Sequence, residues 1–215
     1  MLGHRGCRLG LSFPAIYQMQ VEAIITASAN LIKEGVEVQP EMMIPLTVHV
    51  EEMRRLRKDL TAVAARVQQG LETTVDYKFG TMIETPRGAL TAGQIAQESD
   101  FFSFGTNDLT QMTYGFSRDD AEAKFLRFYV NEKILPADPF VTIDTEGVGA
   151  LVEMGIKSGR ETRPNLEIGI CGEHGGDPAS VAFCHRMGLD YVSCSPFRVP
   201  VARLAAAHAA LAQES

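Results

Sequence analysis

The stretch Phe101-Phe-Ser-Phe-Gly-Thr-Asn-Asp108 joins a short, mostly apolar run to a turn of small and polar residues. The run has no strict alternation of apolar and polar positions, which is typical of a strand in a parallel sheet that is covered on both faces. Four similar runs occur along the chain, so we predict a buried parallel sheet. The five predicted strands cover residues 42–48, 77–83, 101–104, 166–170 and 191–194.

Helical patterns separate these runs. One helix is expected from about residue 14 to residue 33, with Ser12 as its cap and Gly35 as its end. A second is expected over residues 51–69, ending at Gly70, with its basic residues forming a solvent-exposed face. The remaining helices are expected near residues 87–98, 147–158, 178–187 and 200–213. This alternation predicts either a doubly wound sheet or a (β/α)8 barrel, and five strands cannot close an eight-stranded barrel.

The composition of the 215-residue chain excludes several classes of protein. Apolar residues make up 45% and charged residues 22%, which is typical of a globular protein. The net charge of −7 gives no overall attraction to nucleic acid or to an anionic membrane surface. No apolar run is long enough to span a bilayer, and polar residues interrupt any signal-like segment. Four cysteines without a CxxC pair indicate reduced thiols, so we expect a cytoplasmic protein.

Candidate chemistry gathers directly after the predicted strands, where both candidate folds bind ligands. Glu84 and Asp108 each follow a strand, and two carboxylates at neighbouring strand ends can hold Mg2+, although each could equally cap a helix or end a turn. Gly105, Thr106 and Asn107 could cradle an oxyanion or form an ordinary loop. Cys171 is interpreted either as a structural thiol or as a proton donor or nucleophile.

Other motifs carry weaker signals. Arg5 lies among glycines and could bind a phosphate or carboxylate, but a frayed terminus is the simpler interpretation of that segment alone. His174 is interpreted as a loop-ordering partner rather than a base, and zinc is rejected because no second ligand pair has finger spacing. The run from Phe140 to Gly149 imitates a dinucleotide-binding turn but lacks its third glycine, so no nicotinamide cofactor is expected.

Taken together, five segments resemble the C-terminal domain of the pyruvate, phosphate dikinase family of phosphoenolpyruvate-utilising enzymes. They occur in the family's order and span nearly the whole chain. Phosphoenolpyruvate synthase and enzyme I of the sugar phosphotransferase system are related alternatives. The five segments are Leu2-Gly-His-Arg-Gly-Cys-Arg-Leu9, Gly80-Thr-Met-Ile-Glu84, Phe101–Met112, Gly169-Ile-Cys-Gly-Glu-His-Gly-Gly-Asp-Pro178 and Tyr191-Val-Ser-Cys-Ser-Pro-Phe-Arg-Val-Pro200.

The resemblance implies an α/β fold of the (β/α)8 barrel type, here a partial barrel over residues 1–215 holding about its last five strands. It implies that Glu84 and Asp108 bind Mg2+ and that Cys171 exchanges a proton with C3 of the enolpyruvate. The other substrate-binding residues implied are Arg5, Gly105, Thr106 and Asn107.

The resemblance also implies partners for this chain. Pyruvate or phosphoenolpyruvate would be the substrate, and a swivelling phosphohistidine domain would deliver the phosphoryl group. The ATP-grasp and swivelling domains of the family are not recognised in this sequence, so we expect that the chain alone cannot complete the overall phosphotransferase reaction. A homodimer is implied as well, and a non-catalytic fragment that serves only in dimerisation is the alternative of another class.

Overall fold

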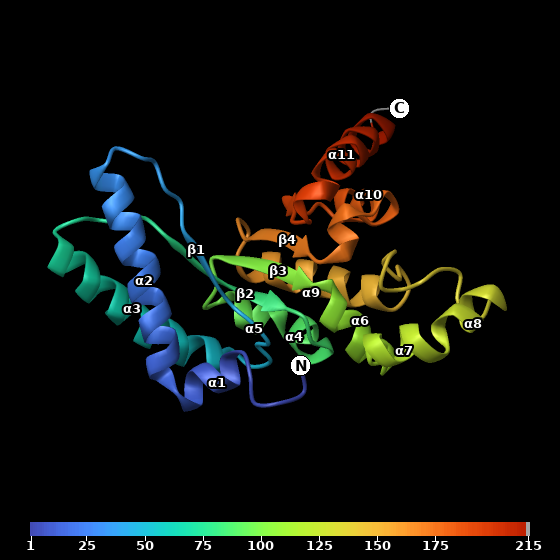
Figure 1. The fold of residues 1–215 in the computed structure, drawn as a ribbon, viewed down its shortest axis with the longest axis horizontal. Helices are drawn as coiled ribbons and strands as arrows, with labels where there is room; N and C mark the ends of the chain where they lie inside the picture. Colours follow the sequence, from blue (N-terminus) through green and yellow to red (C-terminus); the bar gives the residue numbers. More distant parts are fainter. Residues whose placement is uncertain (214–215) are drawn as a thin grey trace.

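Five parallel strands form one sheet in the order β1-β2-β3-β4-β5 in the computed structural model, which describes residues 1–213 (Figure 1). The order follows the chain without reversal. Successive strands of a β/α barrel are arranged in this way, whereas a doubly wound sheet reverses its order at a switch point. The fold is therefore α/β and corresponds to part of a barrel. The strands are β1 (Glu41–Ile44), β2 (Lys78–Ile83), β3 (Phe101–Gly105), β4 (Glu167–Cys171) and β5 (Tyr191–Val192).

Within residues 1–213, eleven α-helices and two short 3-10 helices precede, connect and follow the strands. The 3-10 helices are η1 (Glu173–Gly176) and η2 (Pro196–Arg198). The α-helices are α1 (Cys7–Ser12), α2 (Pro14–Lys33), α3 (Val50–Leu71), α4 (Pro86–Leu90), α5 (Ala92–Ala96), α6 (Thr106–Tyr114), α7 (Arg118–Lys124), α8 (Leu126–Asn131), α9 (Val148–Thr162), α10 (Pro178–Arg186) and α11 (Val199–Gln213).

All five predicted strands are confirmed, and several predicted helix ends are wrong. Ser12 does not cap α2, because it ends α1 and its hydroxyl donates to the Arg8 carbonyl. Pro14 starts α2 instead, since its fixed φ suits the first helical turn. The second helix runs past Gly70 to Leu71. The single helix expected over residues 87–98 is two short helices, α4 and α5.

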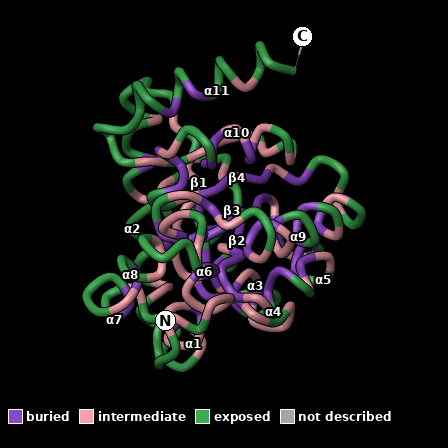
Figure 2. The backbone as a smooth tube through the Cα atoms, turned by 90° about the vertical axis from the view of Figure 1, so that its right-hand side faces the viewer, coloured by how far each residue is buried: buried purple, intermediate pink, exposed green. Residues whose placement is uncertain are grey.

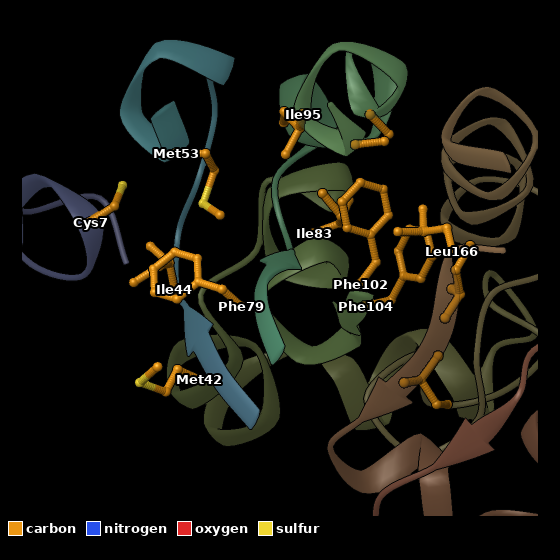
Figure 3. Packing of buried hydrophobic residues seen from close by; sticks show 14 of the residues in the cluster. Cys7, Met42, Ile44, Met53, Phe79, Ile83, Ile95, Phe102, Phe104 and Leu166 are labelled. Atoms are coloured by element: carbon orange, nitrogen blue, oxygen red, sulfur yellow. The ribbon is translucent and has the colours of Figure 1, made fainter. Parts of the chain in front are cut away.

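The main core lies between the sheet and the helices that cover one of its faces (Figure 3). Phe102 and Phe104 of β3 are fully buried and face α9. A Cβ at Gly155 would lie 2.8 Å from the Phe104 ring, and one at Gly159 would lie 3.0 Å from the Phe102 ring. Glycine on α9 therefore lets the helix approach the strand closely enough for two phenylalanines to fill the gap.

Two helical units flank this body. The helices α2 and α3 pack together on one side, and α10 packs against α11 at the carboxyl end (Figure 1). The helices α7 and α8 form a separate lobe, whose small core contains Ala121, Leu126 and Phe140. Much of this lobe and of α11 is exposed, whereas buried residues concentrate on the sheet (Figure 2). Among residues 1–213, no helix combines the length and the apolar character needed to cross a bilayer.

Candidate functional site

The carboxyl ends of β2, β3 and β4 lie side by side and bring the predicted site residues together. In the parallel register Ile83 pairs with Phe104, and Gly105 pairs with Cys171. Glu84 therefore follows β2 at the level where Gly105 ends β3 and Cys171 ends β4. The site predicted from three separate segments forms one edge of the sheet.

Glu84 is the most deeply buried acidic residue of this edge, with 5% of its surface exposed. Its Oε1 accepts a hydrogen bond of 2.6 Å from the backbone N–H of Leu46. The pKa of Glu84 is raised to about 7, chiefly by burial and also by the nearby negative charge of Asp108, while the Leu46 hydrogen bond and the charge of Arg5 oppose the increase. Glu84 and Asp108 thus raise each other's energy when both are ionised, which is an arrangement that a cation would stabilise.

The Leu46 backbone that binds Glu84 has an unusual conformation. Its φ of 58° lies in the left-handed region, which non-glycine residues adopt at a cost. Its carbonyl accepts a hydrogen bond of 3.2 Å from the Cys7 thiol, and the Cys7 N–H donates to the Pro45 carbonyl. The segment before α3 and the start of α1 therefore hold the turn that fixes Glu84.

Gly105 makes room for the Glu84 carboxylate. A Cβ at this position would lie 2.5 Å from Glu84 Oε2 and 2.7 Å from Glu84 Cβ. Any side chain here would displace the carboxylate or the strand, since real Cβ atoms essentially never make contacts this short. Gly105 thus acts through its lack of a side chain.

Asp108 and Asn107 lie in the first turn of α6. The Asn107 amide donates to Asp108 Oδ1 at 3.0 Å, and Arg118 Nη1 donates to Asn107 Oδ1 at 3.1 Å. The guanidinium of Arg118 also lies 5.6 Å from the centre of the Phe140 ring. A cation from the α7–α8 lobe is therefore held at the helix N-terminus beside the carboxylates.

The Thr106 side chain makes its contacts within the protein, between β3 and β4. The residue is fully buried, and its hydroxyl donates to the Cys171 carbonyl at 3.0 Å. The same hydroxyl lies 2.7 Å from His174 Nδ1. Thr106 thus joins the end of β3 to the end of β4.

Cys171 is a free, partly buried thiol that faces the same side of the sheet as Ser103 and Tyr191. Burial raises the pKa of Cys171, and a hydrogen bond with the Ser103 hydroxyl partly offsets this. The same hydroxyl interacts with the Tyr191 phenol, whose pKa burial also raises. Ser103 therefore bridges two protonated groups, and Cys171 is poised as a thiol near neutral pH.

Arg5 lies on an exposed segment just before α1, close enough that its charge lowers the pKa of Glu84. The segment by itself suggested a frayed terminus, and this interpretation is wrong from Cys7 onward, because hydrogen bonds from Cys7 anchor α1 to Pro45 and Leu46.

The turn that imitates a dinucleotide-binding motif is a helix cap. The Asp144 carboxylate accepts hydrogen bonds from the N–H groups that begin α9.

Three residues of the site had not been singled out from the sequence. Ser103 and Tyr191 lie on the same face of the sheet as Cys171. Side chains two positions apart on a strand share a face, so counting back from Gly105 and Cys171 could have found them. Arg118 carried no such signal, because it reaches the site from a separate lobe.

Comparison with known proteins assigns the chain to a family. Residues 1–211 match the model of the PEP-utilising enzyme, PEP-binding domain, and the chain belongs to this family. Among similar proteins are three named pyruvate, phosphate dikinase. The protein of Clostridium symbiosum is 57% identical over a match that covers 98% of this chain and 24% of that protein. The protein of Rickettsia typhi is 55% identical over a match that covers 100% of this chain and 24% of that protein. The chloroplastic protein of Flaveria bidentis is 57% identical over a match that covers 96% of this chain and 22% of that protein.

The chain thus spans about a quarter of the length of the curated relatives that it matches. A solved structure of a citrate lyase from Burkholderia xenovorans shares the fold, with a TM-score of 0.52 and 14% identity. The match covers 76% of this chain and 47% of that one. This likeness concerns the architecture alone.

Proposed function

We propose that this chain forms the phosphoenolpyruvate/pyruvate half-site of a pyruvate, phosphate dikinase. The observation that carries the proposal is the grouping of Glu84, Asp108 and Cys171 at adjacent strand ends, with Arg118 beside them. The proposal is supported by the family to which the chain belongs and by the names of its similar proteins. Phosphoenolpyruvate synthase and enzyme I, which share such a half-site, are less favoured by these names.

A magnesium ion fits the donor set. Residues 1–213 contain no group of three or more histidine, cysteine, aspartate and glutamate side chains that could hold a metal, so a metal here would have two protein carboxylates at most. Glu84 and Asp108 supply two hard oxygen ligands, which suits Mg2+ because that ion keeps water or substrate oxygens in its other positions. When bound, Mg2+ would supply positive charge that stabilises an enolate oxygen.

The remaining groups have distinct tasks in the proposed half-reaction. Cys171, held as a thiol, gives a proton to C3 of the enolate when pyruvate forms, and its thiolate takes one from the methyl group in the opposite direction. Arg5 and Arg118 bind the phosphoryl group and neutralise its charge during transfer. The amides at the start of α6 add donors for an anionic ligand.

The first test is calorimetric titration of the chain with oxalate, an enolpyruvate mimic, with and without Mg2+. Stoichiometric binding that requires Mg2+ is expected, and Asp108→Asn should weaken it about tenfold or more. Asp59→Asn on α3 is the matched control, because that carboxylate accepts from Gln18 and takes no part in the site. An absence of Mg2+-dependent binding in the unsubstituted chain would contradict the proposal.

A second measurement addresses the phosphoryl group. Arg118→Met should weaken the binding of phosphoenolpyruvate about tenfold while leaving oxalate binding nearly unchanged, because only the former carries a phosphate. Equal losses for both ligands would show that Arg118 instead maintains the site through Asn107.

A non-catalytic role in dimerisation is favoured by one surface. The edge strand β1 and helix α2 expose apolar side chains, including Met19, Ile24 and Met43. A hollow of about 440 Å³ beside them is lined by Tyr17 and Ile44 among others. Light scattering after size-exclusion distinguishes a defined dimer from a monomer, and a dimer that fails to bind oxalate would favour this second role.

A further inference from the structure

The backbone N–H of Leu46 is the one hydrogen-bond donor to the Glu84 carboxylate within residues 1–213, and the proposed half-reaction gives Leu46 no task. The bond to Oε1 is 2.6 Å long and joins residues 38 positions apart in the sequence. Oε2 lies instead beside Gly105, where an added Cβ would be 2.5 Å away. Gly105 limits where the carboxylate can move but does not direct it. The Leu46 N–H therefore gives this side chain its preferred orientation.

A single peptide group carries both the donor to Glu84 and a link to α1. Its N–H belongs to Leu46, and its carbonyl belongs to Pro45. That carbonyl accepts a hydrogen bond of 3.1 Å from the N–H of Cys7, the first residue of α1. A trans peptide group is planar, with its C=O and N–H pointing in opposite directions. The bond at the carbonyl end therefore helps to fix the direction in which the N–H points.

The residues on either side of this peptide group are held against β2, the strand that Glu84 follows. The Thr81 hydroxyl donates to the Ile44 carbonyl at 2.8 Å. Because that hydroxyl has one hydrogen, the Thr47 hydroxyl, 2.7 Å away, donates to it in turn. Thr47 and Thr81 are fully buried, and the left-handed backbone of Leu46 lies between these anchors. The turn is thus fixed before any ligand arrives.

We propose that Leu46 is a positioning residue for Glu84, acting through its backbone N–H. This inference rests on the proposed function, in which Glu84 binds a cation. A carboxylate that is already held in one orientation loses less conformational freedom when a ligand binds it. Loss of the N–H should accordingly weaken cation-dependent binding more than loss of a comparable backbone hydrogen bond elsewhere.

Replacing Leu46 with the corresponding α-hydroxy acid removes this N–H and keeps the leucine side chain, because the amide becomes an ester. The same replacement at Leu166 is the matched control. Leu166 is also buried, and its N–H donates to the Arg163 carbonyl at 3.0 Å. It lies just before β4, at the end of the strand opposite the site. Each variant thus loses one backbone hydrogen bond of a buried leucine, and circular dichroism verifies that both are folded.

The principal measurement is calorimetric titration of both ester variants with oxalate in the presence of Mg2+. The ester at Leu46 is expected to weaken binding about tenfold or more, whereas the ester at Leu166 should change the affinity by less than about threefold. Equal affinities in the two variants, or a larger loss with the ester at Leu166, would overturn the inference.

A second measurement requires neither oxalate binding nor a folded ester variant. In the chain labelled with 15N-leucine, nuclear magnetic resonance at about pH 8, where Glu84 is ionised, reports on the Leu46 amide proton. This proton should resonate downfield of that of Leu166, because a short bond to a charged acceptor deshields it more than a bond to a carbonyl.

Substitutions then identify the acceptor. Glu84→Gln should move the Leu46 resonance upfield and leave that of Leu166 in place, and Asp59→Asn should move neither. A Leu46 resonance that does not respond to Glu84→Gln would overturn the positioning role. A responsive resonance in a chain that shows no Mg2+-dependent oxalate binding would contradict the proposed function and not the contact between Leu46 and Glu84.

Discussion

Replacing Glu84 with glutamine should stabilise the metal-free protein in a manner that depends on pH. The glutamine can still accept the Leu46 N–H through its oxygen, so the local hydrogen bond survives. It cannot ionise, however, and the ionised form of Glu84 is the state that burial and Asp108 disfavour. The substitution therefore isolates the free-energy cost of holding a charged carboxylate at this site.

The magnitude follows from the pKa. It rises from an ordinary 4.5 to about 7 in the folded protein, and each pH unit between these values corresponds to about 1.4 kcal/mol. Below pH 4.5 the carboxyl is protonated in both states and the cost vanishes. Between 4.5 and 7 only the unfolded chain releases the proton, so stability falls as pH rises. Above pH 7 the full cost of about 3 kcal/mol applies.

Urea unfolding in the presence of a chelator measures this difference between the two proteins from about pH 4.5 to about pH 8. The advantage of Glu84→Gln should grow to about 3 kcal/mol, or about 6–12 °C in the midpoint of thermal unfolding for a chain of this size. Added Mg2+ should stabilise the unsubstituted chain at the upper pH and leave the variant unaffected. A stability difference that does not change with pH would refute the assignment of the cost to ionisation of Glu84.

Three further substitutions are expected to have separable effects. Cys171→Ala should abolish exchange of the pyruvate methyl protons and leave oxalate affinity within about threefold, and unchanged exchange would remove the thiol from the chemistry. Gly105→Ala should eliminate Mg2+-dependent oxalate binding, because its Cβ would meet Glu84 at 2.5 Å, whereas Gly70→Ala has open space around it and serves as control. Asp100→Asn should lower the free energy of unfolding by about 1–3 kcal/mol near neutral pH, because, against the effect of burial, a backbone N–H and paired arginines lower the pKa of that carboxyl. That loss should disappear as the medium is acidified through the pKa, and a loss that persists in acid would contradict the reasoning.

Much of the architecture was predictable because each strand is a local pattern. The run ending at Gly105 is buried at every position in the structure, as its lack of alternation had indicated. The residues that follow each strand were also predictable as a group, since parallel strands end at one edge. The pattern of strands and helices alone could not distinguish a doubly wound sheet from a barrel, because the order of strands depends on pairings between distant segments; only the family resemblance favoured the barrel.

The helix ends that were predicted wrongly show a different limit. Gly70 is a strong local stop signal, yet α3 continues past it and ends where Glu72 adopts a left-handed conformation. The packing of α3 against α2 and the core extends the helix beyond its local preference. Conversely, Gly35 follows the end of α2 with a φ of 81°, a left-handed conformation that glycine adopts readily.

The sequence by itself determined which residues stand at the strand ends, because side-chain type and strand pattern are properties of neighbours along the chain. The tertiary structure alone decided how these groups affect one another. The pKa of Glu84 depends on burial by distant segments, and His174 meets Thr106 across 68 residues of sequence. Such contacts arise when the sheet aligns its strand ends and the helices pack around them, and no local pattern encodes the resulting distances.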